Sequence, residues 1–75
     1  MPRLPVLSAK EVIGALSKAG YDQDHQRGSH IVLRRREPPH RKVAIPSYRE
    51  LPRGTLRAIV AEAGLTVDQF LDLLE

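Results

Sequence analysis

The sequence predicts an α+β fold in which helices cover one face of a small antiparallel sheet. Apolar residues recur at helical spacing near both ends of the chain, each time after side chains that cap helices. Two segments in the middle alternate apolar and polar residues, and a turn with two prolines separates them. Because 75 residues leave room for one core, we expect a single domain that spans residues 1–75.

The first helix is expected to begin after Ser8, which forms an S-x-x-E capping box with Glu11. Gly20 is placed to end it, since glycine readily adopts the positive φ found just past a helix. Gly14 lies inside the helix, where glycine is unfavourable, so we expect another element to approach closely there. The apolar stripe of this helix consists of Val12, Ile13, Leu16 and Ala19.

Three strands are expected between residues 21 and 46. Residues 30–35 and 42–45 alternate, and the turn at 37–40 makes them antiparallel neighbours. Residues 21–27 are too polar for a central strand but are compatible with an edge strand. Because successive strand residues point to opposite faces, His30, Arg34 and Lys42 share the open face. The residues expected to face the helices are Ile31, Leu33, Val43 and Ile45.

The C-terminal part of the chain predicts a second helix and a last, short one. The stripe of the second helix consists of Leu56, Ile59, Val60 and Ala63, and Gly64 follows it. Thr66 and Gln69 form another capping box at the start of the short helix. Its apolar residues are Phe70, Leu71, Leu73 and Leu74. One interpretation is therefore a small adaptor that recruits a protein through Phe70, Leu71 and Leu74.

Positive charge is concentrated in the middle of the chain. Residues 25–57 hold nine Arg and Lys side chains against two Glu, whereas the remaining residues hold three against seven carboxylates. This asymmetry favours a polyanionic partner, although a solvated surface would have the same composition. The chain has no cysteine, no signal-peptide core and no run of membrane-spanning length. We therefore expect a small cytoplasmic protein without disulfides or membrane contact.

The segment Gly28-Ser29-His30 is the best candidate for chemistry. An imidazole can give and take a proton near neutral pH, and arginine and lysine bind phosphate. RNA carries its own nucleophile in the 2′-OH, and its metal-free cleavage needs a proton shuttle within a phosphate-binding surface. We predict that His30 is the catalytic general acid or base. The predicted RNA-binding residues are Arg27, Gly28, Ser29, Arg34, Arg41 and Lys42.

The other candidate side chains are less informative. His25 and His40 lie in polar segments where histidine is unremarkable, and we expect no chemical task for them. No cysteine or converging carboxylate completes a zinc site with the histidines, so we expect neither a metal nor a small-molecule cofactor. Tyr48 could stack on a base, donate a proton or simply pack.

Three motifs occur in order along the chain: Gly28-Ser29-His30, Val43-Ala44-Ile45-Pro46, and the run from Glu50 to Ile59 that continues to Ala63-Gly64-Leu65. In these motifs the chain resembles HicA-type toxins, the ribonuclease half of a bacterial toxin–antitoxin pair. The resemblance covers nearly the whole chain. It implies a fold similar to the double-stranded-RNA-binding domain, metal-independent endonucleolytic cleavage of messenger RNA with His30 as the essential histidine, and a HicB-type antitoxin that covers the active surface.

Two questions stay open at this stage. Ile31 and Tyr48 occupy positions where the family often has a histidine, so the resemblance does not identify a second proton carrier. A non-catalytic RNA-binding module of the same fold would use the same basic residues, with His30 incidental. The fold alone does not separate a protein that binds RNA from one that cuts it.

Overall fold

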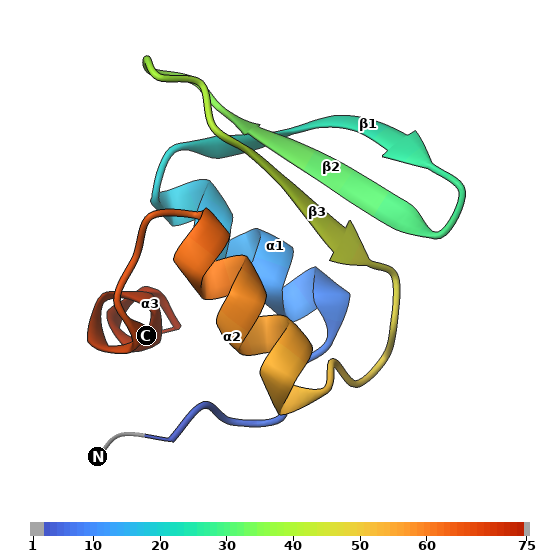
Figure 1. Cartoon of the computed structure of the whole chain (residues 1–75), viewed down its shortest axis with the longest axis vertical. Helices are drawn as coiled ribbons and strands as arrows, with labels where there is room; N and C mark the ends of the chain where they lie inside the picture. The colour runs from blue at the N-terminus through green and yellow to red at the C-terminus, as the bar shows by residue number, and fades with distance from the viewer. Residues whose placement is uncertain (1–2, 75) are drawn as a thin grey trace.

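The computed structural model describes residues 3–74 and confirms the predicted α+β layout. Its elements are, in chain order, α1 (Ala9–Lys18), β1 (Tyr21–Arg27), β2 (His30–Arg35), β3 (Lys42–Pro46), α2 (Arg53–Glu62) and α3 (Val67–Leu73). The three strands form one antiparallel sheet in the order β1-β2-β3, and both α1 and α2 lie against the same face of it (Figure 1). The opposite face carries no helix in the part of the chain that the structure describes.

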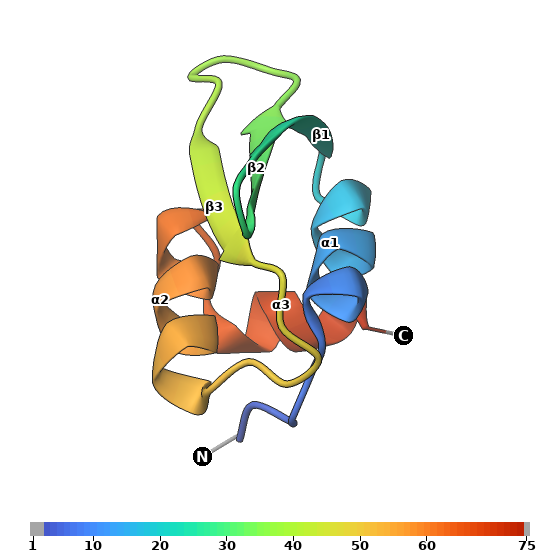
Figure 2. The ribbon, with the colours of Figure 1, turned by 90° about the vertical axis from the view of Figure 1, so that its right-hand side faces the viewer.

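The side view shows how the helices divide the covered face between them (Figure 2). Helix α1 lies on the β1 side and α2 on the β3 side, while α3 contacts both helices. The core between these layers is apolar and contains residues from every element. Leu33, Val43 and Ile45 are fully buried in it and Ile31 is partly buried, which confirms the face predicted for all four.

Helix α1 begins and ends as the sequence predicts. The Ser8 hydroxyl accepts a hydrogen bond from the Glu11 backbone N–H (3.1 Å), and the Glu11 carboxylate accepts one from the Ser8 N–H (3.0 Å). Gly20 has a φ of 95° just past the helix. The expectation for Gly14 is wrong: a Cβ atom there would meet nothing within 4 Å, so no neighbouring element requires a glycine.

Strand β1 is the element whose form the sequence left least defined. Tyr21 is buried, and its hydroxyl donates to the Ala63 carbonyl (3.0 Å), whereas the other six residues are exposed. Its pairing with β2 is interrupted between Gln23 and His25, where one extra residue, Asp24, forms a β-bulge. The strand is therefore an edge strand with a bulge.

The C-terminal helices close the core. The predicted capping box of α3 is confirmed, with the Thr66 hydroxyl accepting from the Gln69 N–H (3.1 Å) and the Gln69 side chain accepting from the Thr66 N–H (2.9 Å). Phe70 is fully buried, and Leu71 and Leu74 pack against the core. This burial counts against the adaptor interpretation, because Phe70 is not accessible to a partner and Leu71 and Leu74 are only partly exposed. Within residues 3–74 no helix is long and apolar enough to cross a membrane.

Candidate active site

His30 is the first residue of β2, directly after a two-residue turn. Gly28 has a φ of 60°, and two-residue hairpin turns need a positive φ at this position. The Ser29 carbonyl accepts a hydrogen bond from the Ser47 N–H (2.7 Å), which fixes the turn to the end of β3. His30 is exposed. The turn therefore holds an accessible imidazole at one end of the sheet.

The register of the sheet arranges the open face in three rows, because residues directly opposite each other in antiparallel strands share a face. Starting from the Gly28-Ser29 turn, and taking β1, β2 and β3 in order, the rows are Arg27–His30–Pro46, His25–Val32–Ala44 and Asp22–Arg34–Lys42. The predicted open-face set of His30, Arg34 and Lys42 is thus confirmed as a shared face. All the ionisable residues of these rows are exposed.

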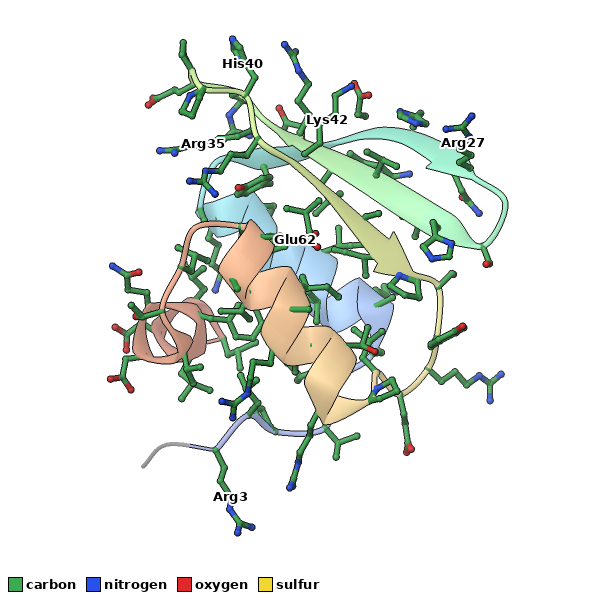
Figure 3. All side chains as sticks on the ribbon, in the orientation of Figure 1. Arg3, Arg27, Arg35, His40, Lys42 and Glu62 are labelled. Atoms are coloured by element: carbon green, nitrogen blue, oxygen red, sulfur yellow. The ribbon has the colours of Figure 1, made fainter. Side chains whose placement is uncertain are left out.

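The structure gathers some of the predicted RNA-binding residues and not others. Arg27 lies directly across from His30, and Arg34 pairs with Lys42 two rows away. Figure 3 shows Arg27 and Lys42 on the side of the sheet that faces away from the helices. Gly28 and Ser29 form the exposed turn beside Arg27. Among these residues, Arg27 carries a charge directly beside His30, and the charges of Arg34 and Lys42 lie two rows further along the same face.

Arg41 lies elsewhere. Its guanidinium donates to the Glu62 carbonyl (3.2 Å) at the C-terminus of α2, and a Cβ atom on Gly64 would come within 3.3 Å of its Cζ. A cation near the last carbonyls of a helix offsets their partial negative charge. Arg41 therefore bridges the β2–β3 connection to α2 and does not share a row with His30.

The β-bulge places an Asp–His pair on this face. Asp24 is the extra residue of the bulge, and its Oδ2 lies 2.8 Å from Nδ1 of His25. The hydrogen bond from His25 lowers the pKa of Asp24 below the usual range for aspartate, and the charges of His25, Lys42 and Arg34 lower it further. The Asp24 carboxylate is therefore ionised at neutral pH and lies within the field of the open-face cations.

Tyr48 belongs to a different surface. It is 51% exposed and lines a groove of about 510 Å³ together with Ile13 of α1 and Ile31 and Gln23 of the sheet. Ile31 and Gln23 belong to the helix-facing side of the sheet, opposite to the face of His30. The groove therefore does not bring Tyr48 onto the His30 face.

His40 lies apart from the His30 face, in the β2–β3 connection. The ring Nδ1 of His40 lies 3.1 Å from the Arg35 carbonyl oxygen, in the β2–β3 connection at the end of the sheet away from His30. Figure 3 shows His40 at that connection. Among residues 3–74, no three His, Cys, Asp or Glu side chains gather in a way that could hold a metal ion.

Asp24 and His25 form a pair on the open face for which the sequence predicts no function. An acidic residue beside a histidine was the only signal for it in the sequence. Because side chains alternate along a strand, His25 would lie on the face of Tyr21 if β1 were regular. The bulge at Asp24 moves His25 to the open face. A polar segment carries no sequence pattern from which a bulge can be predicted.

Comparison with known proteins identifies the family of the chain. The family described as HicA toxin of bacterial toxin-antitoxin matches residues 9–65, a range that runs from the start of α1 into the α2–α3 connection. This range includes His30 and every residue of the three rows. No significant match was found among curated proteins. The chain therefore belongs to the HicA toxin family, and it is the toxin of a toxin–antitoxin pair, with an antitoxin as its partner.

Proposed function

We propose that this toxin is an endoribonuclease that cleaves messenger RNA, with His30 as a general acid or base and with no requirement for a metal ion. The observation that carries the proposal is the position of His30. It is an exposed imidazole with Arg27 directly across the strand pair and with Arg34 and Lys42 on the same face. This arrangement combines proton transfer with charge stabilisation, the two functions that RNA cleavage needs.

The chemistry follows from the substrate. Removing the proton of a 2′-OH lets that oxygen form a bond to the adjacent phosphorus, and the bond from phosphorus to the 5′-oxygen breaks. The departing 5′-oxygen takes up a proton, which leaves a 2′,3′-cyclic phosphate and a free 5′-OH. Proton transfer by a positioned side chain typically contributes about 10²–10⁴-fold to such a step. Arginine and lysine side chains stabilise the negative charge that builds on the phosphoryl oxygens.

We propose that the antitoxin is of the HicB type and covers the open face with acidic side chains, because this face carries Arg27, Arg34 and Lys42. Residues 1–75 act as one toxin domain around a single core, and the site of action is the cytoplasm, where messenger RNA is translated.

The deciding experiment is cleavage of a long single-stranded RNA in EDTA by wild type, His30→Ala and His30→Gln. Circular dichroism checks that each variant is folded. Wild type is expected to release fragments with 2′,3′-cyclic phosphate ends, and both variants are expected to be at least about 10²-fold slower. Tight RNA binding with no cutting by wild type would favour the non-catalytic binding module. Cutting by His30→Ala at the wild-type rate would refute the assigned role.

A further inference from the structure

We propose that His25 is the second proton-transfer group of the site and that Asp24 is the residue that positions it. This inference rests on the proposed ribonuclease function and names the group that the sequence left open. Three observations carry it: the face on which His25 lies, its place relative to His30, and its hydrogen bond to Asp24.

The β-bulge decides the face. Gln23 pairs with Leu33 on the helix-facing side, and the next paired residue of β1 is His25, opposite Val32 on the open side. Asp24 is inserted between them, so the alternation of β1 shifts by one residue at this point. His25 is 47% exposed and therefore accessible to a substrate that lies on the sheet.

The register also sets the spacing of the two histidines. Val32 is two residues after His30 on the same face, so His25 and His30 are diagonal neighbours on adjacent strands. Side chains in this relationship are typically about 7–8 Å apart, and imidazoles reach further than their Cβ atoms. Two rings at this separation can contact opposite sides of one phosphate.

The geometry of cleavage explains why two groups are useful. The attacking 2′-oxygen and the departing 5′-oxygen lie on opposite sides of the phosphorus in an in-line displacement. One imidazole cannot contact both oxygens without moving, whereas two imidazoles can take one each. A neutral ring accepts the 2′-OH proton while a protonated ring donates to the 5′-oxygen, so the pair exchanges protonation states and the proton count balances.

Asp24 orients the imidazole ring of His25. Its Oδ2 is hydrogen-bonded to Nδ1 of His25 at 2.8 Å, which leaves Nε2 free for the substrate. A carboxylate in this position fixes which ring nitrogen faces the substrate, as in other sites where a histidine transfers protons. The charged and titratable groups around His25 are Asp22, Asp24, Arg27, His30, Arg34 and Lys42 on the three strands, and Arg36, which pairs with Asp22 just after β2.

The first test measures single-turnover RNA cleavage in EDTA over a range of pH for His25→Ala, with His40→Gln as the matched control. His40 is the remaining histidine, and it lies in the β2–β3 connection away from the site. We expect His25→Ala to cleave about 10²–10⁴-fold more slowly, with one limb of the pH–rate profile missing. His40→Gln is expected to retain the wild-type rate and profile, and RNA affinity is expected to stay close to wild type in both.

A second test separates catalysis from structure. It uses an RNA in which sulfur replaces the 5′-oxygen at one linkage, because a thiolate leaves without being protonated. We expect this substrate to restore cleavage in one of His25→Ala and His30→Ala, namely the variant that lacks the general acid. Asp24→Asn is expected to cleave about tenfold more slowly, with both limbs of the pH–rate profile present but shifted. The matched control is Asp22→Asn, because the Asp22 carboxylate pairs with Arg36, and this variant is expected to keep the wild-type rate.

The outcomes distinguish the two proposals. Wild-type cleavage by His25→Ala together with an inactive His30→Ala would overturn the role of His25 and leave the ribonuclease function standing. A slow His25→Ala with an unchanged pH profile and no rescue of either variant by sulfur would also overturn it. Absence of cleavage by wild type would refute the ribonuclease function itself.

Discussion

At the scale of single residues, the candidate site depends on a few backbone and side-chain details around His30. Gly28 turns the chain so that β2 starts at the histidine, and Asp24 gives the neighbouring His25 a fixed hydrogen-bond partner. Neither residue is buried. Substitutions at these positions should therefore act through backbone conformation and charge, and not through a loss of core packing.

Gly28→Ala is expected to lower the free energy of unfolding by about 1–2 kcal/mol, because an L-residue is strained at positive φ. A Cβ atom at Gly28 would meet nothing within 4 Å, so the cost is conformational and not steric. The matched control is Gly14→Ala, which has equally open space but helical backbone, and we expect it to stabilise by about 0.4–1 kcal/mol. Urea denaturation measures the free energy of unfolding of both variants, and a change of the same sign in both would contradict this account.

Titration of the Asp24 carboxyl by carbon NMR is expected to show a pKa below the usual range for aspartate, and His25→Ala is expected to raise it. The direction follows because the hydrogen bond from His25, the largest cause, favours the ionised form. A lowered pKa in the folded state contributes stability above the unfolded-state pKa, and this contribution disappears as the pH falls through the folded pKa. An identical Asp24 titration in wild type and His25→Ala would count against the hydrogen bond.

At the scale of elements, the edge strand and the β2–β3 connection determine which charges lie on the open face of the sheet. The bulge in β1 brings His25 onto the open face, while the connection directs Arg41 toward the end of α2. Adjacent basic residues, Arg41 and Lys42, thus have different surroundings. Their proximity in sequence says little about a shared role.

Arg41→Ala is expected to lower the free energy of unfolding by about 1 kcal/mol, since it removes the hydrogen bond to the Glu62 carbonyl at the end of α2. Lys42→Ala is expected to leave stability within about 0.5 kcal/mol of wild type and to weaken RNA binding instead. Urea denaturation and RNA titration of the two variants check the contrast. A larger loss of RNA affinity in Arg41→Ala than in Lys42→Ala would reverse the assignment.

Deletion of Asp24 is expected to preserve the fold and keep the free energy of unfolding within about 1 kcal/mol of wild type. The reason is the register: Gln23 and His25 already pair with the consecutive residues Leu33 and Val32, so joining them makes the ladder regular. Circular dichroism and urea denaturation measure the outcome. Loss of the folded state would show that the bulge is needed for the strand to form.

At the scale of the whole molecule, the sheet presents its charge on the side that the helices leave uncovered. Arg27 and Lys42 point to this side, whereas Arg3 lies at the far end of the molecule, below the helices (Figure 3). The helices and the core hold the sheet from the other side. An RNA strand or an acidic antitoxin surface can therefore contact the open face without disturbing the core.

RNA affinity is expected to fall steeply with salt, because each phosphate contact releases counterions from the strand. For single strands the slope of log K against log salt changes by about 0.7 per contact. The triple variant Arg27→Ala, Arg34→Ala, Lys42→Ala is therefore expected to have a slope about 2 units shallower than wild type, and Arg3→Ala an unchanged slope. Equal changes in both would show that binding does not use the open face.

The sequence by itself determined both ends of α1, the end of α2 and the start of α3, the antiparallel pairing of β2 and β3, and the face on which His30 lies. Capping boxes and glycines define helix ends by local hydrogen bonding and backbone freedom, and both act within a few residues of the chain. The alternation of Ile31, Leu33, Val43 and Ile45 defines a buried face, which places His30 and Lys42 opposite. These features depend only on short-range pattern.

Only the tertiary structure decided the face of His25, the partner of Arg41 and the side of the sheet to which Tyr48 belongs. Beyond Tyr21, strand β1 has no buried residue to anchor its alternation, so its register depends on pairing with β2 and on the bulge at Asp24. Arg41 donates a hydrogen bond to the end of α2, 21 residues further along the chain. The physical reason is the same in each case: polar side chains on exposed segments carry no pattern of burial, and their positions follow from elements distant in the chain.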